Sequence, residues 1–131
     1  MDSKATILIV DDDPLHLELY GMILEKAGFK GLPVLVSYAG MEFPDGETVH
    51  AALVDYRLGP SLSACSAVQK VKDRYPSAPI LILSDMYDAP ADTAPLVQGF
   101  VHKGNPEKLL SALHDLIRAK PPESLDNGSN L

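Results

Sequence analysis

The chain has 131 residues, a hydrophobic fraction of 46% and a formal net charge of −7. This length is enough for one domain with a buried core. The acidic balance argues against a nucleic-acid partner, because phosphate binding needs a basic face. No apolar run approaches the roughly 20 residues that span a bilayer, and a single cysteine excludes an internal disulfide and a cysteine-rich zinc site. We therefore expect a cytoplasmic protein without membrane association.

Five short runs rich in Ile, Leu and Val predict β-strands. The first and the fourth are continuous rather than alternating, which favours strands buried on both faces, as in a parallel sheet. In chain order the predicted strands are 6–10, 33–37, 51–55, 79–84 and 99–103.

Three other segments have helical patterns. Asp13 and Asn105 each precede a proline, an order typical of an N-cap followed by the first helical residue. Each helical segment also carries apolar residues at the spacing of one helix face. The helices are predicted from Pro14 to a stop at Gly28, over 63–75, and from Pro106 to the prolines at 121 and 122.

Two connections are poor helix formers, because glycine and proline interrupt both 38–49 and 85–98. A parallel crossover still needs a dozen residues or more, so we expect a short or irregular helix in each. The alternation of strands and helices predicts an α/β, doubly wound, five-stranded parallel sheet with helices on both faces. The polar segment 121–131 is expected to be disordered or to serve as a linker.

Charged and hydroxyl side chains stand at the ends of the predicted strands. In a doubly wound sheet the functional crevice lies beyond these carboxyl ends. Hard carboxylate oxygens suit Mg²⁺, and Mg²⁺, an ammonium and a hydroxyl together can hold a phosphoryl group. The four histidines show no metal-ligand spacing. The strand ends carry Asp11, Asp12 and Asp13 on the first strand, Asp55 on the third, Ser84 on the fourth and Lys103 on the fifth.

Over roughly residues 5–119 the chain resembles the receiver domains of two-component response regulators. Each matching motif is weak alone, but the four in this order are specific. The resemblance implies the sheet order 2-1-3-4-5 and a receiver domain over residues 1–120. The matching motifs are "VDDD", "LVDYRLGP", "ILILSD" and "GFVHKG", around Asp12, Asp55, Ser84 and Lys103.

The resemblance also implies roles for individual residues in a phosphorelay. Asp55 would accept the phosphoryl group, as in other phosphoproteins of this kind, and Ser84 and Lys103 would bind it. Ser84 and Phe100 would act as the conformational switch, and Asp13 would cap the first helix. The implied Mg²⁺ ligands are Asp11, Asp12, Asp55 and the backbone carbonyl of Arg57.

The implied partners are a sensor histidine kinase or phosphotransfer protein, and a downstream target or fused output domain; a homodimer is also possible. Asp85 and Gly104 depart from the family pattern. Asp85 stands where a small residue is usual, and we expect it to pair with Arg57. Gly104 replaces a proline. Together with the proline-broken segment 85–98, these departures favour an alternative: a receiver-like interaction module that works without phosphorylation. A third hypothesis, a Mg²⁺-dependent phosphatase, lacks a general acid two residues after Asp55.

Overall fold

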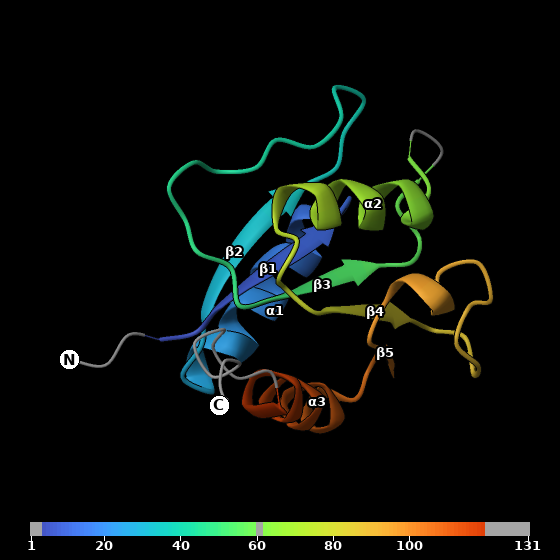
Figure 1. The fold of residues 1–131 in the computed structure, drawn as a ribbon. Helices are drawn as coiled ribbons and strands as arrows, with labels where there is room; N and C mark the ends of the chain where they lie inside the picture. The colour runs from blue at the N-terminus through green and yellow to red at the C-terminus, as the bar shows by residue number, and fades with distance from the viewer. Residues whose placement is uncertain (1–3, 60–61, 120–131) are drawn as a thin grey trace, which may run out of the picture.

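Five parallel strands form one sheet in the order β2-β1-β3-β4-β5 (Figure 1). The computed structural model describes residues 4–59 and 62–119. The doubly wound sheet and its order agree with the sequence-based prediction. The polar segment expected at 121–131 lies outside the described residues. The strands are β1 (Thr6–Asp11), β2 (Lys30–Leu35), β3 (Ala51–Asp55), β4 (Ile80–Ser84) and β5 (Gly99–His102).

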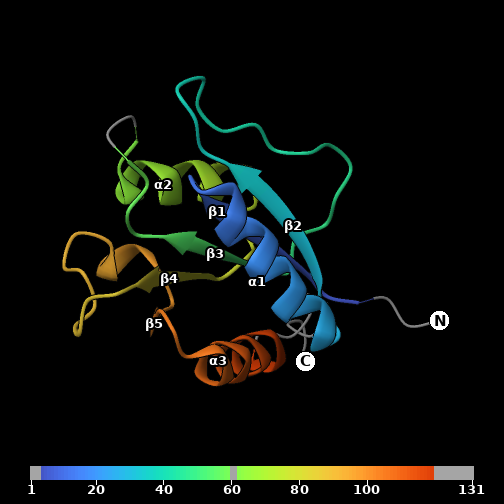
Figure 2. The same ribbon diagram turned by 180° about the vertical axis from the view of Figure 1, so that it is seen from behind.

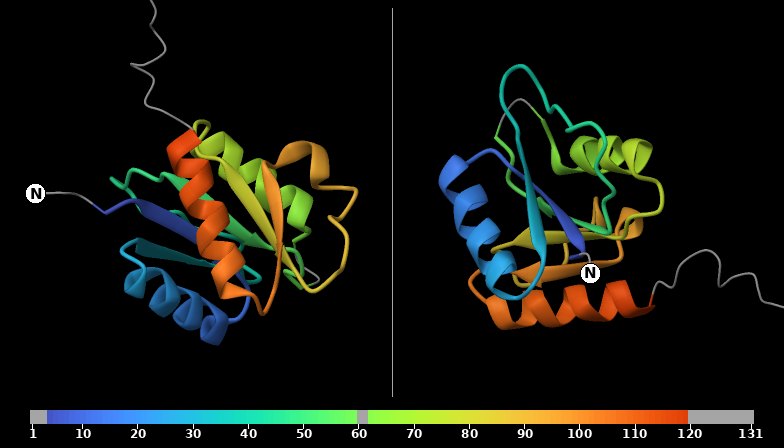
Figure 3. Two further views of the ribbon diagram at one scale, coloured as in Figure 1. Left: turned by 90° about the horizontal axis from the view of Figure 1, so that it is seen from below. Right: turned by 90° about the vertical axis from the view of Figure 1, so that its left-hand side faces the viewer.

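Helices α1 (Pro14–Lys26) and α3 (Pro106–Ala119) cover one face of the sheet, and α2 (Ala64–Arg74) covers the other (Figures 2 and 3). The predicted caps explain where two of these helices begin. The Asp13 carboxylate accepts a hydrogen bond from the Leu15 N–H, and the Asn105 side-chain oxygen accepts one from the Lys108 N–H. The chain therefore passes from the carboxyl end of β1 directly into α1.

The three central strands are buried along their whole length. The continuous apolar runs of the first and fourth predicted strands indicated this for β1 and β4, because a strand covered on both faces does not alternate. Two separate cores result. The first core lies between the sheet and the helices α1 and α3, and the second core lies on the opposite face of the sheet, which α2 covers. None of the helices in residues 4–59 and 62–119 is long and apolar enough to cross a membrane.

The predicted second strand is displaced along the chain. It was expected at 33–37 and runs from Lys30 to Leu35. Pro33 lies in the middle of the strand, opposite Ile9 of β1. A proline is tolerated there because β2 is an edge strand, with no neighbour to accept from the missing N–H.

The two weak connections differ from each other. The helix expected at 38–49 is wrong: residues 36–50 form turns and extended chain, with Gly40 and Gly46 at positive φ. Positive φ is incompatible with a right-handed helix. Apolar side chains of this loop, including Phe43, still pack on the second core and so take the place of a helix. The segment 85–98 contains one turn of 3₁₀-helix, η1 (Ala94–Leu96), which confirms the irregular helix expected there.

Candidate functional site

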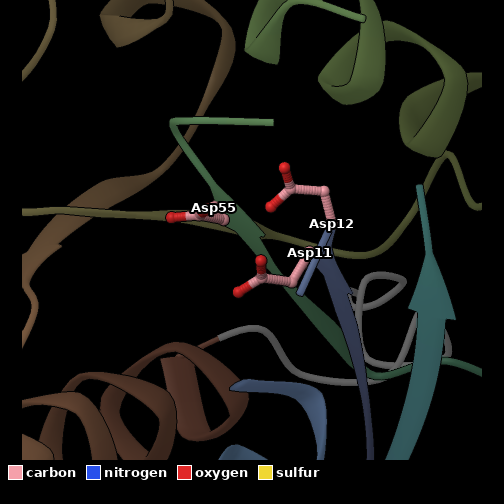
Figure 4. Close-up of side chains that lie close together, drawn as sticks. All are labelled: Asp11, Asp12 and Asp55. Atoms are coloured by element: carbon pink, nitrogen blue, oxygen red, sulfur yellow. The ribbon is translucent and has the colours of Figure 1, made fainter. Parts of the chain in front are cut away.

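The carboxyl ends of β1 and β3 bring three aspartates together (Figure 4). Asp11 ends β1, Asp12 directly follows it, and Asp55 ends β3. Each offers one carboxylate oxygen, and these three oxygens lie within 4.8 Å of one another. Asp11 and Asp55 are buried, whereas Asp12 is exposed. The sequence pattern predicted this convergence, because the carboxyl ends of parallel strands share one edge of the sheet.

The residue directly after β5 brings a cation to the same place. The Lys103 Nζ lies 2.6 Å from Asp55 Oδ1, and the two side chains are only 22% and 3% exposed. Burial lowers the pKa of Lys103, but the hydrogen bond and charge of Asp55 outweigh this effect, so its pKa is raised overall. Lys103 is therefore a firmly protonated partner for a buried carboxylate.

Burial and neighbouring negative charge raise the pKa of both buried carboxyls. For Asp11 the pKa rises from 3.8 to about 6, first through burial and then through the charge of Asp55. A hydrogen bond from the Asp13 backbone N–H to Asp11 Oδ1, 3.1 Å long, opposes this rise. Burial also raises the pKa of Asp55, although Lys103 lowers it in part. Burial is the largest cause of both shifts, so a bound cation would favour the charged forms of these carboxyls.

Asp13 and His16 form the boundary between this cluster and α1. Asp13 caps the helix, as the sequence predicted. His16 is one of the four histidines without metal-ligand spacing, and it was not predicted to lie at the site. Its Nδ1 lies 3.3 Å from Asp11 Oδ2, and its Nε2 lies 3.5 Å from Asp13 Oδ2. The spacing of one helical turn between Asp13 and His16 was the signal available in the sequence.

Asp12 is confined by the loop that follows β3. A Cβ atom added at Gly59 would lie 3.1 Å from Asp12 Oδ2, and Gly59 has a φ of +84°. Both facts favour glycine at this position. The three carboxylates fit Mg²⁺ in their chemistry, because this ion prefers hard oxygen ligands and takes few carboxylates from the protein.

Ser84 ends β4, and Phe100 lies on β5 opposite Ile82. Ser84 is 1% exposed, and its Oγ accepts a hydrogen bond from the Met86 N–H at 3.0 Å. Within residues 4–59 and 62–119 this hydroxyl makes no other side-chain hydrogen bond, so its proton can be donated. Phe100 is half-buried and packs against the second core. Backbone pairing aligns the two strand ends, because the Lys103 N–H donates to the Ser84 carbonyl at 2.7 Å.

The two residues that follow Asp55 both contact the segment 85–98. Arg57 Nε and Nη2 lie 3.3 and 3.2 Å from Asp85 Oδ1, which confirms the predicted pair. This hydrogen bond lowers the pKa of Asp85. The Tyr56 hydroxyl donates to the Asp92 carboxylate, with oxygen distances of 3.1 and 3.2 Å. The second contact was not predicted, because it depends on the course of an irregular segment.

In the sequence comparisons this chain is similar to part of a larger protein. No protein-family model matches the chain. A cyclic di-GMP phosphodiesterase of Thermotoga maritima is 31% identical over 123 residues, which is 93% of this chain and 31% of that protein. The chain therefore spans about a third of the length of this curated relative.

Solved structures resemble the chain over most of its length. The receiver domain protein (CheY-like) of Methanospirillum hungatei matches with a TM-score of 0.73 and 21% identity, over 90% of this chain and 97% of its own. Full-length FixJ of B. japonicum matches with a TM-score of 0.76 and 24% identity, over 94% and 62%. The signal receiver domain of an HD domain-containing protein from Pseudomonas fluorescens matches with a TM-score of 0.72 and 16% identity, over 90% and 98%.

These likenesses define the fold as that of the response regulator receiver domains. The resemblance of the four sequence motifs to this class is thus confirmed at the level of the fold. The acidic cluster lies at the carboxyl edge of the sheet, where doubly wound folds place their ligands.

Proposed function

We propose that the chain is a receiver domain that accepts a phosphoryl group on Asp55 and relays a signal through a conformational change. The observation that carries this proposal is the Asp55–Lys103 pair, 2.6 Å apart, beside two further carboxylates. The domain would comprise residues 1–120 and act in the cytoplasm.

In the proposed reaction a carboxylate oxygen of Asp55 forms a bond to phosphorus, and the bond from phosphorus to the imidazole nitrogen of a phosphohistidine breaks. The carboxylate and the phosphoryl group are both anionic, so the reaction needs positive charge at the reacting atoms. Lys103 supplies one such charge at Asp55. The carboxylates of Asp11, Asp12 and Asp55 and the carbonyl of Arg57 would hold Mg²⁺, which when bound would neutralise phosphoryl oxygens.

The relay would begin at Ser84. Its free hydroxyl proton would be donated to the phosphoryl group, and Phe100 on the neighbouring strand would follow that movement. The phosphoryl donor would be a sensor histidine kinase or a phosphotransfer protein. The receiver of the signal would be a downstream protein, a fused output domain or a second copy of the chain.

The test is Mg²⁺-dependent modification by acetyl phosphate, followed by intact-protein mass spectrometry, with beryllofluoride binding as a second readout. We expect one adduct on the wild-type protein, lost in Asp55→Asn and retained in Asp73→Asn, a matched change on the exposed face of α2. An unmodified wild-type protein under these conditions would refute the proposal.

A second candidate is a receiver-like module that binds a partner without phosphorylation. Asp85 favours it, because this anion stands next to Ser84, close to the place proposed for another anion. Exposed apolar side chains on α1, among them Leu15 and Met22, would suit a protein interface. A partner affinity or dimer constant that is equal in the wild-type and Asp55→Asn proteins would support this candidate.

We propose no enzymatic role for the chain itself. A phosphatase that used Asp55 as its nucleophile would need a nearby general acid, and Arg57, two residues further on, is a cation paired with Asp85. The activity named for the Thermotoga maritima relative belongs to a protein of which this chain matches 31%. Absence of turnover on phosphomonoesters is the expected result.

A further inference from the structure

The loops after β3 and β4 leave the sheet side by side. These strands are neighbours, with Asp55 opposite Leu83, and the Tyr56 N–H donates to the Leu83 carbonyl at 2.9 Å. Arg57 lies two residues after Asp55 on the first loop, and Asp85 lies directly after Ser84 on the second. Their ion pair bridges the two loops at the edge that carries the acidic cluster.

The geometry of this ion pair allows Arg57 to change its partner. Two of the three guanidinium nitrogens, Nε and Nη2, approach the same oxygen, Asp85 Oδ1, so the fork does not use the second carboxylate oxygen. The two side chains are 66% and 56% exposed. Exposed pairs of this kind contribute little to stability and are screened by water and salt.

Phosphorylation of Asp55 would change the balance of charge around this pair. A phosphoryl group brings nearly two negative charges and three acceptor oxygens. The negative charges of the phosphoryl group, Asp11 and Asp12 together then exceed the positive charges of Lys103 and one divalent cation. Asp85 adds a further anion. A guanidinium binds a phosphate more strongly than a single carboxylate oxygen, because its planar fork matches two phosphate oxygens.

We propose that Arg57 exchanges partners, releasing Asp85 and binding the phosphoryl group on Asp55 as a second cation beside Lys103. This inference rests on the proposed function and assigns Arg57 a role through its side chain, separate from its backbone carbonyl. The released Asp85 would be repelled by the new anion, so the loop after β4 would move outward when the phosphoryl group arrives.

A simpler role for Arg57 makes a different prediction. If Arg57 only masks the charge of Asp85, it has no function once Asp85 is neutral. If it binds the phosphoryl group, it remains necessary in an Asp85→Asn background. A double-mutant cycle separates the two roles, because each change is made alone and together.

The experiment measures Mg²⁺-dependent binding of beryllofluoride, a phosphoryl analogue, by wild type, Arg57→Gln, Asp85→Asn and the double variant. Asp85→Asn should bind several-fold more tightly than wild type. Arg57→Gln should weaken binding roughly five- to tenfold in the Asp85→Asn background, as expected for one charge-assisted hydrogen-bonded contact. Arg57→Lys should recover only part of this loss, since an ammonium keeps the charge without the fork.

Two readouts exclude a merely structural effect of Arg57. The affinity for Mg²⁺ alone should not fall in Arg57→Gln, because the proposed ligand there is a backbone carbonyl. The Nε–H resonance of Arg57 should shift on beryllofluoride addition in both wild type and Asp85→Asn.

Two negative results have separate meanings. Equal beryllofluoride affinities for Asp85→Asn and the double variant would overturn the exchange and leave the proposed function standing. A wild-type protein that does not bind beryllofluoride would instead sink the proposed function.

Discussion

Replacing Lys103 with methionine should lower the free energy of unfolding by about 3 kcal/mol in buffer free of divalent cations. Lys103 is 22% exposed and Asp55 is 3% exposed, so the change leaves a buried carboxylate without its cation. The negative charge of Asp12, which raises the pKa of Asp55, then acts without compensation by Lys103. Methionine keeps most of the apolar stem, so lost packing contributes little to the effect. The expected loss of unfolding free energy lies at the low end of the range for broken buried ion pairs, because Lys103 is partly exposed to solvent.

The loss should depend on pH in a defined direction. Without Lys103 the folded-state pKa of Asp55, already raised by burial, rises further above its unfolded value. A raised folded-state pKa adds stability at low pH that disappears as the pH rises through that pKa. Urea denaturation should therefore show a larger difference between Lys103→Met and wild type at pH 8 than at pH 5.

Two controls make this prediction specific. Lys70→Met, at an exposed position on α2, should change the unfolding free energy by less than about 0.5 kcal/mol. Adding Asp55→Asn to Lys103→Met should recover most of the loss, because the orphaned charge is removed. If Lys103→Met is no less stable than Lys70→Met at pH 8, the buried pair does not hold the site in the way argued above.

Three further predictions concern the metal site and the core. Gly59→Ala and Gly46→Ala both place a side chain at positive φ, but only Gly59 faces a site carboxylate; each should cost about 1 kcal/mol, and only Gly59→Ala should weaken Mg²⁺ binding in calorimetry. Leu113→Ala should cost about 3 kcal/mol in urea denaturation, against little for the exposed Leu15→Ala. Because Asp11 has a pKa of about 6, the metal-free protein should lose stability as the pH rises through that value, and thermal melts with Mg²⁺ should not show the loss.

The strands that carry the site were predictable because their signals are local. A continuous apolar run marks a strand buried on both faces, and the residue that ends the run falls at the sheet edge. Asp55 and Ser84 could be placed in this way without any knowledge of the neighbouring chain. The cap at Asp13 was equally local, because a carboxylate before Pro14 has few other roles.

What the sequence could not supply depends on neighbours that only the fold defines. The start of β2 at Lys30 requires Pro33 to lie in an edge strand, and that follows from the sheet order rather than from the strand itself. The loop 36–50 covers a sheet face without a helix, because apolar side chains such as Phe43 replace the packing of a helix face. His16 contacts Asp11 only because α1 leaves the sheet directly above it.

The segment 85–98 is held in a way that links it to Asp55. A helix at this position would satisfy its own backbone hydrogen bonds. Here side chains from other elements hold the segment instead: Arg57 contacts Asp85, Tyr56 donates to Asp92, and the Lys72 ammonium donates to the carbonyl of Leu96 at 3.2 Å. Two of these contacts come from the residues directly after Asp55, and the Cys65 thiol adds another by donating to the Asp92 carbonyl at 3.1 Å. Any displacement of the backbone at Tyr56 and Arg57 therefore moves the anchors of this segment, so its position depends on Asp55 more directly than that of a self-supporting helix would.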